Sequence, residues 1–439
     1  MQLTVLNLTD DPMICSWDDK RKDCDEHLVL ASRIPLEAKV PSRCRKLALF
    51  GQAAMKDTEG WCPAMIRFSM RTGATWQRLE VEDDHPWSVY AVKISINHRK
   101  LIILPKRNVS AFLSDMPDAS PLYSLLLPGT HDSMAFYGWP ISQCQSPSTP
   151  LAVQLQSGIR VLDIRLAVIN SRLIAYHGIY PQRTPFEDIQ RTIHNFLTAP
   201  ETCRETIVMS MKQEDFATTK PSTFSRTVHK EMWSGPGGRD MWFLKNRVPT
   251  LGEVRGKVVL ISRFGGNGDG WEGGLEGLGI HPTNWPDSAK DGFTWECKDT
   301  HVRTHDWYAI PSFLSIPEKF ALSTEILMYP PANAQPEKTL SITFFSAASF
   351  PLATPPAVAQ GFGWPRWGLG VEGVNSRVGA WLLDLLSGMD VVESKDLFGS
   401  EVRLRGWALM DFYSDPEHAL ADLLVECNYR GRCAGEEGW

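Results

Sequence analysis

Residues 125–133, Leu-Leu-Leu-Pro-Gly-Thr-His-Asp-Ser, bring two titratable side chains to the end of an apolar run. The run is typical of a buried strand, it stops at Pro-Gly, and His131 and Asp132 follow at once. In barrels and open α/β sheets, the C-terminal ends of the strands carry the catalytic groups. Taken alone, the stretch fits two interpretations equally: a catalytic edge, or a turn with an exposed histidine in which Asp132 caps a helix.

Polar residues recur at the ends of the later predicted strands. Asp163 and Arg165 are two residues apart in Leu-Asp-Ile-Arg-Leu, so both side chains face the same side of a strand. That pair alone could be a structural ion pair. The other members of the set are His177, Lys212, Arg263, Asp306, Tyr308 and Asp411. Their recurrence at matching strand ends favours one shared site over separate structural roles.

This set of residue types suits the cleavage of a phosphodiester. One histidine as base and the other as acid can drive in-line attack of a hydroxyl on phosphorus. An arginine neutralises the phosphoryl oxygens through a planar pair of hydrogen bonds. Carboxylates that hydrogen-bond the imidazoles fix their tautomers. We therefore expect a reaction that requires no metal and no cofactor.

The elements that must position these residues begin near residue 120, where strands start to alternate with helical stretches. Strands are predicted over residues 161–166, 206–211, 257–262, 339–345 and 407–412, and helices over residues 151–157, 185–197 and 374–386. This βα alternation favours an α/β fold with a parallel TIM-type barrel over a doubly wound sheet.

Two segments of this region are predicted to be loops. Residues 265–279 are rich in glycine but lack the Gly-Lys-Ser/Thr ending of a phosphate loop, so we expect a flexible excursion there. Residues 351–365, rich in Pro, Ala and Gly, are predicted to form a long loop.

Residues 1 to about 110 follow a different pattern. Short apolar runs alternate with clusters of Asp, Gly and Pro, and residues 87–96 alternate in polarity as a half-buried strand does. We expect a small β-sandwich-like domain without a catalytic cluster. The chain is therefore divided into an accessory β-rich domain, residues 1–112, and a barrel domain, residues 113–439.

The composition argues against several classes of protein. A net charge of −6 and a pI near 6.0 give no electrostatic case for binding nucleic acid. No run of 18 apolar residues occurs, and the first residues lack the basic and apolar regions of a signal peptide. Nine cysteines without a Cys-x-x-Cys pair indicate reduced thiols and no zinc site. We expect a cytoplasmic monomer that is peripheral to membranes, with secretion by another route left open.

Tryptophan is frequent, with 16 residues in the chain. Trp139, Trp364 and Trp367 lie beside Pro and Gly in turn-rich segments. A tryptophan in a loop can sit at the headgroup depth of a membrane, where its amphipathic ring is stable. The alternative is that each ring packs against its own loop.

Several motifs together resemble the X region of the bacterial-type phosphatidylinositol-specific phospholipases C, within the PLC-like phosphodiesterases. The most specific are Leu-Pro-Gly-Thr-His-Asp-Ser and Gln-Leu-Gln-Ser-Gly-Ile-Arg-Val-Leu-Asp-Ile-Arg. His-Gly, Glu-Thr-Ile-Val-Met-Ser-Met-Lys, Leu-Ile-Ser-Arg and Gly-Trp-Ala-Leu-Met-Asp-Phe follow in the order of the family. The resemblance covers roughly residues 115–425. It implies a distorted, incompletely closed TIM barrel that cleaves phosphatidylinositol, a GPI anchor or both.

The resemblance also implies roles for the site residues. His131 is then the general base for the inositol 2-hydroxyl and Asp411 orients it, while His177 is the general acid for the diacylglycerol leaving group, supported by Asp132. Arg165 holds the phosphate, and a cyclic inositol phosphate forms first and is slowly hydrolysed. The residues implied to bind the inositol ring are Asp163, Lys212, Arg263, Asp306 and Tyr308.

Calcium-dependent eukaryotic relatives carry a calcium-binding carboxylate where Arg165 stands, and Asn where Asp132 stands. Because a guanidinium replaces the charge of the cation, the resemblance implies a metal-independent enzyme. One alternative is a catalytically idle barrel that binds phosphoinositide headgroups or membranes. Another is a glycerophosphodiester phosphodiesterase, but that family usually opens with His-Arg-Gly and uses a metal-binding carboxylate cluster that we do not find.

Overall fold

The structure is a computed structural model of the chain. It describes residues 1–17, 26–41, 46–51, 64–67, 74–81, 85–328, 338–365, 369–388 and 403–432. These residues form two compact units. One unit contains Met1–Arg107 and the described residues between 364 and 368 and between 379 and 399, and the other contains the remaining described residues.

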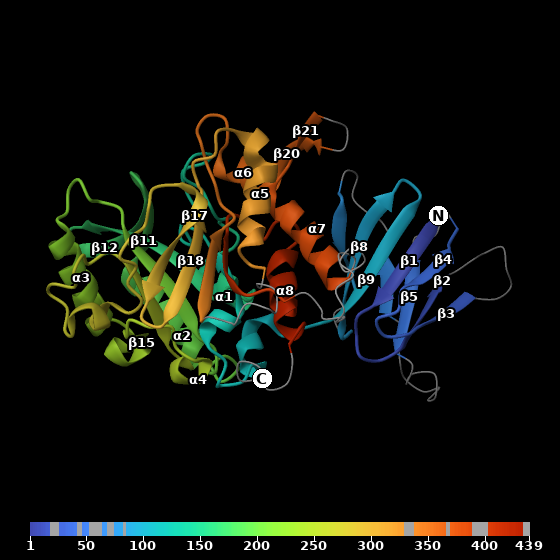
Figure 1. Ribbon diagram of the computed structural model, residues 1–439, viewed down its shortest axis with the longest axis horizontal. Coiled ribbons are helices and arrows are strands. Elements are labelled where there is room, and N and C mark those ends of the chain that lie inside the picture. Colours follow the sequence, from blue (N-terminus) through green and yellow to red (C-terminus); the bar gives the residue numbers. More distant parts are fainter. Residues whose placement is uncertain are drawn as a thin grey trace. The chain divides into compact units, whose positions relative to one another are not determined.

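The larger unit is built on a curled sheet of mostly parallel strands, in the order β15-β16-β14-β11-β10-β22-β19-β18-β17 (Figure 1). Its strands are β10 (Leu126–Thr130), β11 (Val161–Ile169), β14 (Ile207–Gln213), β15 (Trp242–Phe243), β16 (Val258–Arg263), β17 (Ala289–Cys297), β18 (Thr300–Asp306), β19 (Thr339–Phe344) and β22 (Gly406–Met410). Only β17 pairs antiparallel along this path. Because β15 and β17 are its two edges, the described sheet is an incompletely closed TIM-type barrel, as the sequence predicts.

The larger unit contains the helices α1 (Leu151–Gln156), α2 (Phe186–Thr198), α3 (Pro221–Ser234), α4 (Leu251–Val254), α5 (Ile316–Glu325), α6 (Pro355–Gln360) and α8 (Ala419–Glu426). Helix α8 contacts β10, α3 contacts β11 and α5 contacts β19. Helix α7 (Val374–Leu386) is divided between the two units. The apolar side chains of β16, β19 and β22 join helical and loop residues in one buried core. None of the described helices is long and apolar enough to cross a membrane.

The first strand of the barrel continues through Pro-Gly instead of stopping there. β10 runs to Thr130, and Pro128 lies opposite Ala408 of β22. Proline is tolerated because the pairing of β10 with β11 begins only at Gly129, so no ladder hydrogen bond requires the missing N–H. A Cβ at Gly129 would lie 2.8 Å from Val161, so glycine allows the two strands to approach. The turn that follows places His131 and Asp132 at the rim.

A β-hairpin extends from the barrel after β11. β12 (Arg172–His177) pairs antiparallel with β11 and with β13 (Tyr180–Pro185). His177 is the last residue of β12, so it reaches the site from an antiparallel strand and not from a parallel barrel strand.

The prediction of one long loop over residues 351–365 is wrong. The segment contains α6 and then β20 (Gly361–Trp364), which pairs with β21 (Leu369–Glu372). Prolines at the first positions of α6 fit a helix start, where the missing N–H is not needed. The glycine-rich residues 265–279 contain only a short 3-10 turn, Gly274–Leu278, besides loop.

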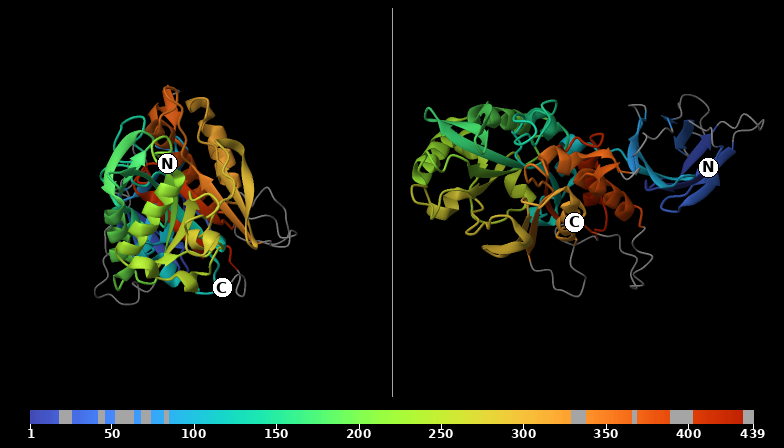
Figure 2. Two further views of the ribbon diagram at one scale, coloured as in Figure 1. Left: turned by 90° about the vertical axis from the view of Figure 1, so that its left-hand side faces the viewer. Right: turned by 90° about the horizontal axis from the view of Figure 1, so that it is seen from above.

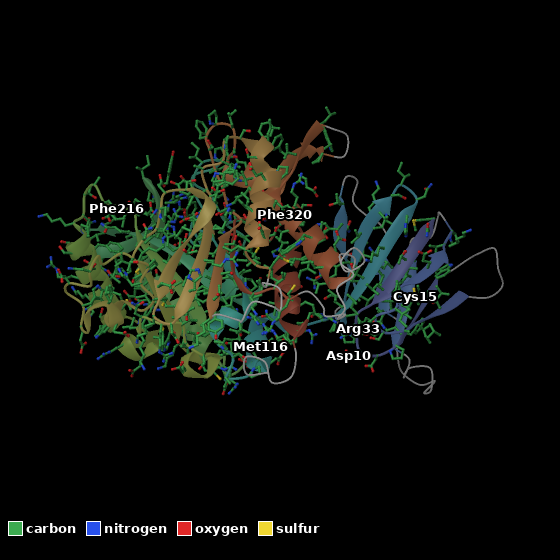
Figure 3. The ribbon with its side chains drawn as sticks, in the orientation of Figure 1. Asp10, Cys15, Arg33, Met116, Phe216 and Phe320 are labelled. Atoms are coloured by element: carbon green, nitrogen blue, oxygen red, sulfur yellow. The ribbon has the colours of Figure 1, made fainter. Side chains whose placement is uncertain are left out.

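The smaller unit holds two sheets, which Figure 2 shows in blue. The first has the order β4-β1-β9-β8-β7, and the second has the order β3-β2-β5-β6. Their strands are β1 (Gln2–Asn7), β2 (Met13–Trp17), β3 (Glu26–Leu30), β4 (Leu36–Lys39), β5 (Lys46–Gly51), β6 (Ala64–Arg67), β7 (Trp76–Leu79), β8 (Trp87–Ser95) and β9 (His98–Pro105). Side chains of both sheets share one apolar core, which contains Cys15, labelled in Figure 3. This arrangement is sandwich-like.

The structure describes five cysteines, Cys15, Cys144, Cys203, Cys297 and Cys427. Of these, Cys144, Cys203, Cys297 and Cys427 carry free thiols. The remaining four cysteines lie outside the described residues.

Candidate active site

Charged side chains from neighbouring strands converge at the C-terminal rim of the barrel. The register places Arg165 of β11 opposite Lys212 of β14, and Lys212 opposite Arg263 of β16. Three cations therefore stand in a row across three strands. Carboxylates from the same and adjoining strands face them, so the rim is a dense cluster of opposite charges.

His131 is held by a partner on each ring nitrogen. Its Nδ1 lies 2.8 Å from Oδ1 of Asp411, and its Nε2 lies 2.6 Å from Nη2 of Arg165. Because the guanidinium can only donate, Nε2 must present its lone pair, and the ring proton must be on Nδ1, donated to Asp411. Burial, followed by the charge of Arg165, lowers the pKa of His131 well below its ordinary value. His131 is therefore a neutral imidazole with a basic Nε2.

Asp411 follows β22 and is almost fully buried. Burial, followed by the negative charge of Asp132, raises the pKa of Asp411 well above its usual range. A carboxylate with a raised pKa is a stronger hydrogen-bond acceptor for the Nδ1–H of His131 than an exposed aspartate. The side-chain amide of Asn375 donates to the backbone carbonyl of Asp411 at 3.0 Å, which holds this segment in place.

His177 faces His131 across the site. The two ring centroids are 6.4 Å apart, and the ring planes are nearly perpendicular at 89°. Nδ1 of His177 donates to the carbonyl of Ser142 at 2.8 Å, which directs Nε2 toward Asp132, 3.3 Å from its Oδ2. Each histidine therefore has its own carboxylate partner.

Asp132 and Asp163 lie on either side of the Nε of Arg165, each with an Oδ2 atom 3.2 Å away. Burial is the largest influence on Asp132 and raises its pKa to about 6 despite Arg165. Burial also raises the pKa of Asp163, but Arg165 and Arg263 together outweigh it and lower that pKa. One of the two carboxyl groups can thus take a proton near neutrality, while the other stays ionised.

The residues that the resemblance assigns to the inositol ring lie in two groups. Asp163, Lys212 and Arg263 belong to the row of charges, and Nη1 of Arg263 lies 3.8 Å from Oδ1 of Asp163. Asp306 is connected through Trp285, whose Nε1 donates to its Oδ2 at 2.8 Å and whose ring lies 4.0 Å from the guanidinium carbon of Arg263.

Tyr308 lies at the edge of the site and is 40% exposed. Its hydroxyl donates to Asp287, and this hydrogen bond raises the pKa of Tyr308 to about 12. Its ring remains open to a ligand.

Three residues of the site escaped the sequence analysis. Glu214 lies 3.2 Å from Lys212 Nζ and 3.6 Å from Arg165 Nη1. It could have been found, because it follows Lys212 by two residues and so faces the same side of the strand. Trp285 comes from an irregular segment and gives no periodic signal. Cys144, with its Sγ 3.8 Å from His177 Nδ1, comes from a loop and gives none either.

None of the hydrogen bonds and ion pairs described for this cluster involves Trp139 or Trp364, two of the predicted membrane-interface tryptophans. Trp139 is 65% exposed and Trp364 is 63% exposed, while Trp367 lies outside the described residues. Trp139 belongs to the segment before Ser142, which is joined to β13 by the hydrogen bond from the Tyr137 N–H to Gln182 at 2.9 Å. This segment and the residues that join β12 to β13 and begin β13 carry several exposed apolar side chains. This exposed group consists of Tyr137, Trp139, Ile141, Ile179 and Tyr180.

A metal ion would meet unfavourable surroundings here. In the described part of the chain, the possible ligand atoms of His131, Asp132 and Cys144 lie within 4.8 Å of one another. However, the guanidinium of Arg165 lies 2.6 Å from Nε2 of His131 and would repel a cation bound beside this ring. Burial, followed by the charge of Asp411, raises the pKa of Cys144 well above its ordinary value, so the thiolate that a metal prefers is disfavoured. The donor set therefore fits a metal poorly.

Comparison with known proteins gives one consistent result. The family model described as "Phosphatidylinositol-specific phospholipase C, X domain" matches residues 139–264, a segment that includes His177 and the row of cations. The 1-phosphatidylinositol phosphodiesterase of Listeria monocytogenes is 31% identical over 178 residues, which are 38% of this chain and 53% of the relative. The enzyme of the same name from Staphylococcus aureus strain Newman is 29% identical over 161 residues, 35% of this chain and 51% of the relative. The chain thus spans about half the length of the curated relatives it matches.

A solved structure from a study of membrane binding by Staphylococcus aureus phosphatidylinositol-specific phospholipase C shares the fold. Its TM-score is 0.55 at 20% identity, and the match covers 73% of this chain and 98% of that chain. A second structure from a study of the same subject gives a TM-score of 0.53 with the same identity and coverage.

Proposed function

We propose that this chain cleaves the phosphodiester of an inositol phospholipid, because residues 139–264 match the X-domain model of the phosphatidylinositol-specific phospholipases C and the curated relatives are named 1-phosphatidylinositol phosphodiesterase. The observation that carries the proposal is the pair of facing imidazoles, each with its own carboxylate, with Arg165 in contact with His131 and with Asp132. The chemistry and the substrate class proposed below rest on this geometry together with the family resemblance.

In the first step, Nε2 of His131 accepts the proton of the inositol 2-hydroxyl, and the resulting oxygen attacks phosphorus. The phosphorus–oxygen bond to diacylglycerol breaks, and His177 gives that oxygen a proton. The products are diacylglycerol and a cyclic inositol phosphate. Asp411 stabilises the imidazolium that forms on His131, as it already accepts the Nδ1 proton.

Arg165 supplies the positive charge that the phosphoryl oxygens require. Its Nη2 lies at the hydrogen-bonding position on Nε2 of His131, 2.6 Å away. A substrate hydroxyl replaces it there, and the planar guanidinium then turns to the phosphate. Because Arg165 already provides a cation at this point, the proposed reaction uses no metal.

The leaving group departs on the side of His177, where exposed apolar side chains gather. Ile179 is 86% exposed just after His177, and Trp139 is 65% exposed on the neighbouring segment. Amphipathic and apolar side chains of this kind are stable at the lipid interface. We propose that this exposed group, Tyr137, Trp139, Ile141, Ile179 and Tyr180, is a peripheral contact with the membrane that holds the substrate.

The test of the activity is a panel of vesicles containing phosphatidylinositol, other inositol phospholipids or a GPI-anchored protein, assayed for water-soluble phosphate products. We expect a cyclic inositol phosphate from wild type with or without EDTA, and at least about 10²–10⁴-fold less from His131→Ala and from His177→Ala. Turnover that persists in either variant, or that is lost with EDTA, contradicts the mechanism. Lipid binding without turnover in wild type supports the idle-barrel alternative instead.

The membrane contact is tested by co-sedimentation with the same vesicles. Trp139→Ala combined with Ile179→Asp should weaken vesicle binding by about 10-fold or more, because both remove apolar surface from the interface. Ile169→Asp, which changes another exposed isoleucine of the same unit, is the matched control and should bind normally. Equal binding by all three proteins would rule out this surface.

A further inference from the structure

A buried lysine without a partner lies behind the site, and the mechanism above does not use it. Lys319 is fully buried in the first half of α5, beside Phe320, which is labelled in Figure 3. Within the described part of the chain, its Nζ makes no hydrogen bond. A buried ammonium without a partner is among the most costly features that a folded protein can contain.

The position of Lys319 is fixed by its neighbours on α5. Glu318 points outward and forms an exposed ion pair with Lys290 at 2.6 Å. Ser323, one turn later, donates to the carbonyl of Lys319 and to that of Phe344, the last residue of β19, and accepts from or donates to Nδ1 of His305 at 3.3 Å. Ser323 thus attaches α5 to the ends of β18 and β19, and the side chain of Lys319, one turn earlier, is buried.

Two carboxylates of the candidate active site attract this ammonium. The charges that act on Lys319 are those of Asp306, at the end of β18, and Asp411, just after β22. In the sheet order β19 lies between these two strands, so Lys319 approaches from α5 near the strand between the two carboxylates. The third titratable neighbour is His305, whose pKa is lowered to about 3 by burial and then by Lys319, and which is therefore neutral.

We propose that Lys319 is a positioning residue that keeps Asp411 ionised from behind, so that Asp411 accepts the Nδ1 proton of His131. The groups that face Asp411 are His131, Cys144, Asp132, Asp163 and Arg165. The two aspartates favour protonation of Asp411, and Arg165 opposes them from the substrate side. Lys319 adds a second opposing charge, and this charge stays in place when Arg165 turns to the substrate phosphate.

The pH range of this effect follows from the burial of the lysine. Burial lowers the pKa of Lys319 to about 7, against the opposing attraction of Asp306 and Asp411. Lys319 is therefore charged below about pH 7 and loses its charge as the pH rises above that value. The lysine should extend the working range of the His131–Asp411 pair toward acid.

The test compares full-length wild type with Lys319→Met, Lys319→Arg and the control Lys230→Met, an exposed lysine on α3. The first measurement is the NMR signal of the Nδ1 proton of His131 as a function of pH. In Lys319→Met the signal characteristic of the hydrogen bond to Asp411 should disappear about 0.5 to 1 pH unit higher than in wild type. Lys319→Arg, which keeps the charge, and Lys230→Met should follow wild type.

The second measurement is turnover of phosphatidylinositol, and this arm alone rests on the proposed function. In Lys319→Met, kcat should fall about 10-fold near pH 5.5 with little change in KM, and the acidic limb of the rate profile should move upward with the NMR signal. If wild type proves inactive, the proposed function fails, while the NMR comparison still decides the role of Lys319.

The third measurement separates positioning from a structural role. Because methionine removes a buried charge without leaving a cavity, Lys319→Met should melt at the same temperature as wild type or higher. Loss of folding in Lys319→Met, or an NMR titration identical to that of wild type, overturns the proposal.

Discussion

Two arginines, Arg160 just before β11 and Arg165 in the middle of that strand, show how differently the two rims of this barrel use buried charge. Arg160, just before the strand, is fully buried and donates to Glu205 through Nε, to the carbonyls of Leu155 and Ile159 through Nη1, and to that of Ser110 through Nη2. Arg165, within the strand, contacts His131 and lies between two carboxylates, with 13% of its side chain exposed.

The difference lies in how completely the polar groups are satisfied. At the Arg160 end, Glu205 also accepts from the backbone N–H and hydroxyl of Ser114, so the ion pair is enclosed by hydrogen bonds. At the Arg165 end, buried atoms of four charged groups have no hydrogen-bond partner among the described residues. They are Asp132 Oδ2, Asp163 Oδ1, Glu214 Oε1 and Arg263 Nη1. Unsatisfied buried charge is costly, so its concentration at one rim indicates groups that are kept for a ligand.

The largest expected effect on activity comes from replacing Arg165, at the rim where buried charged atoms lack hydrogen-bond partners. Arg165→Lys keeps the positive charge but loses the planar fork that binds two phosphoryl oxygens, so kcat/KM should fall about 10²–10³-fold. The free energy of unfolding should change little, because the charge balance with Asp132 and Asp163 is retained. Initial rates on phosphatidylinositol vesicles and urea denaturation measure the two quantities. A stability loss as large as the activity loss would mean that Arg165 is mainly a structural residue.

Arg160→Lys, the same substitution at the opposite rim, should lower stability and leave activity unchanged. Arg160→Lys leaves several buried carbonyl oxygens without donors, so the free energy of unfolding should fall by about 4 kcal/mol. The kcat/KM of the folded fraction should equal that of wild type, because Arg160 contacts no residue of the site. Denaturation and rate measurements below the melting temperature test this. If Arg160→Lys lost activity per folded molecule, the hydrogen bonds of Arg160 at one rim would influence the reaction at the other.

This contrast was only partly accessible from the sequence. The parallel strands and the polar residues at their ends could be predicted, because buried strands are marked by apolar runs that stop at charged residues. Glu214 was missed although it shares that signal, and Trp285 was missed because irregular segments carry no periodicity. The structure also shows α6 and β20 where a loop was predicted, since a Pro-rich composition marks both helix starts and loops.

The smallest expected effect concerns the stability of the protein as a function of pH. It tests whether the buried charge of Asp132, at the rim with unpartnered charges, destabilises the fold. The pKa of Asp132 is raised from 3.8 to about 6 by burial, so the fold favours the protonated carboxyl. The contribution of Asp132 to the free energy of unfolding is fully present below pH 3.8 and is lost as the pH rises through about 6. Asp132→Asn is neutral at every pH, so it should be more stable than wild type by about 2 to 3 kcal/mol at pH 8 and equal to it at pH 4.

Asp118 is the matched control for this prediction, because its pKa is shifted in the opposite direction. It lies outside the cluster and accepts hydrogen bonds from Arg255 and Arg204, and the bond to Arg255 is the main reason that its pKa is lowered. Stability from Asp118 is present at neutral pH and lost in acid, so Asp118→Asn should be slightly less stable than wild type at pH 8. Its activity should be unchanged, whereas Asp132→Asn should lose about 100-fold because His177 loses its carboxylate. Denaturation curves at pH 4, 6 and 8 give the free energies of unfolding that test this prediction. If Asp132→Asn gained no more stability at pH 8 than at pH 4, the buried charge of Asp132 would not destabilise the fold. The two rims would then differ less than their hydrogen bonds suggest.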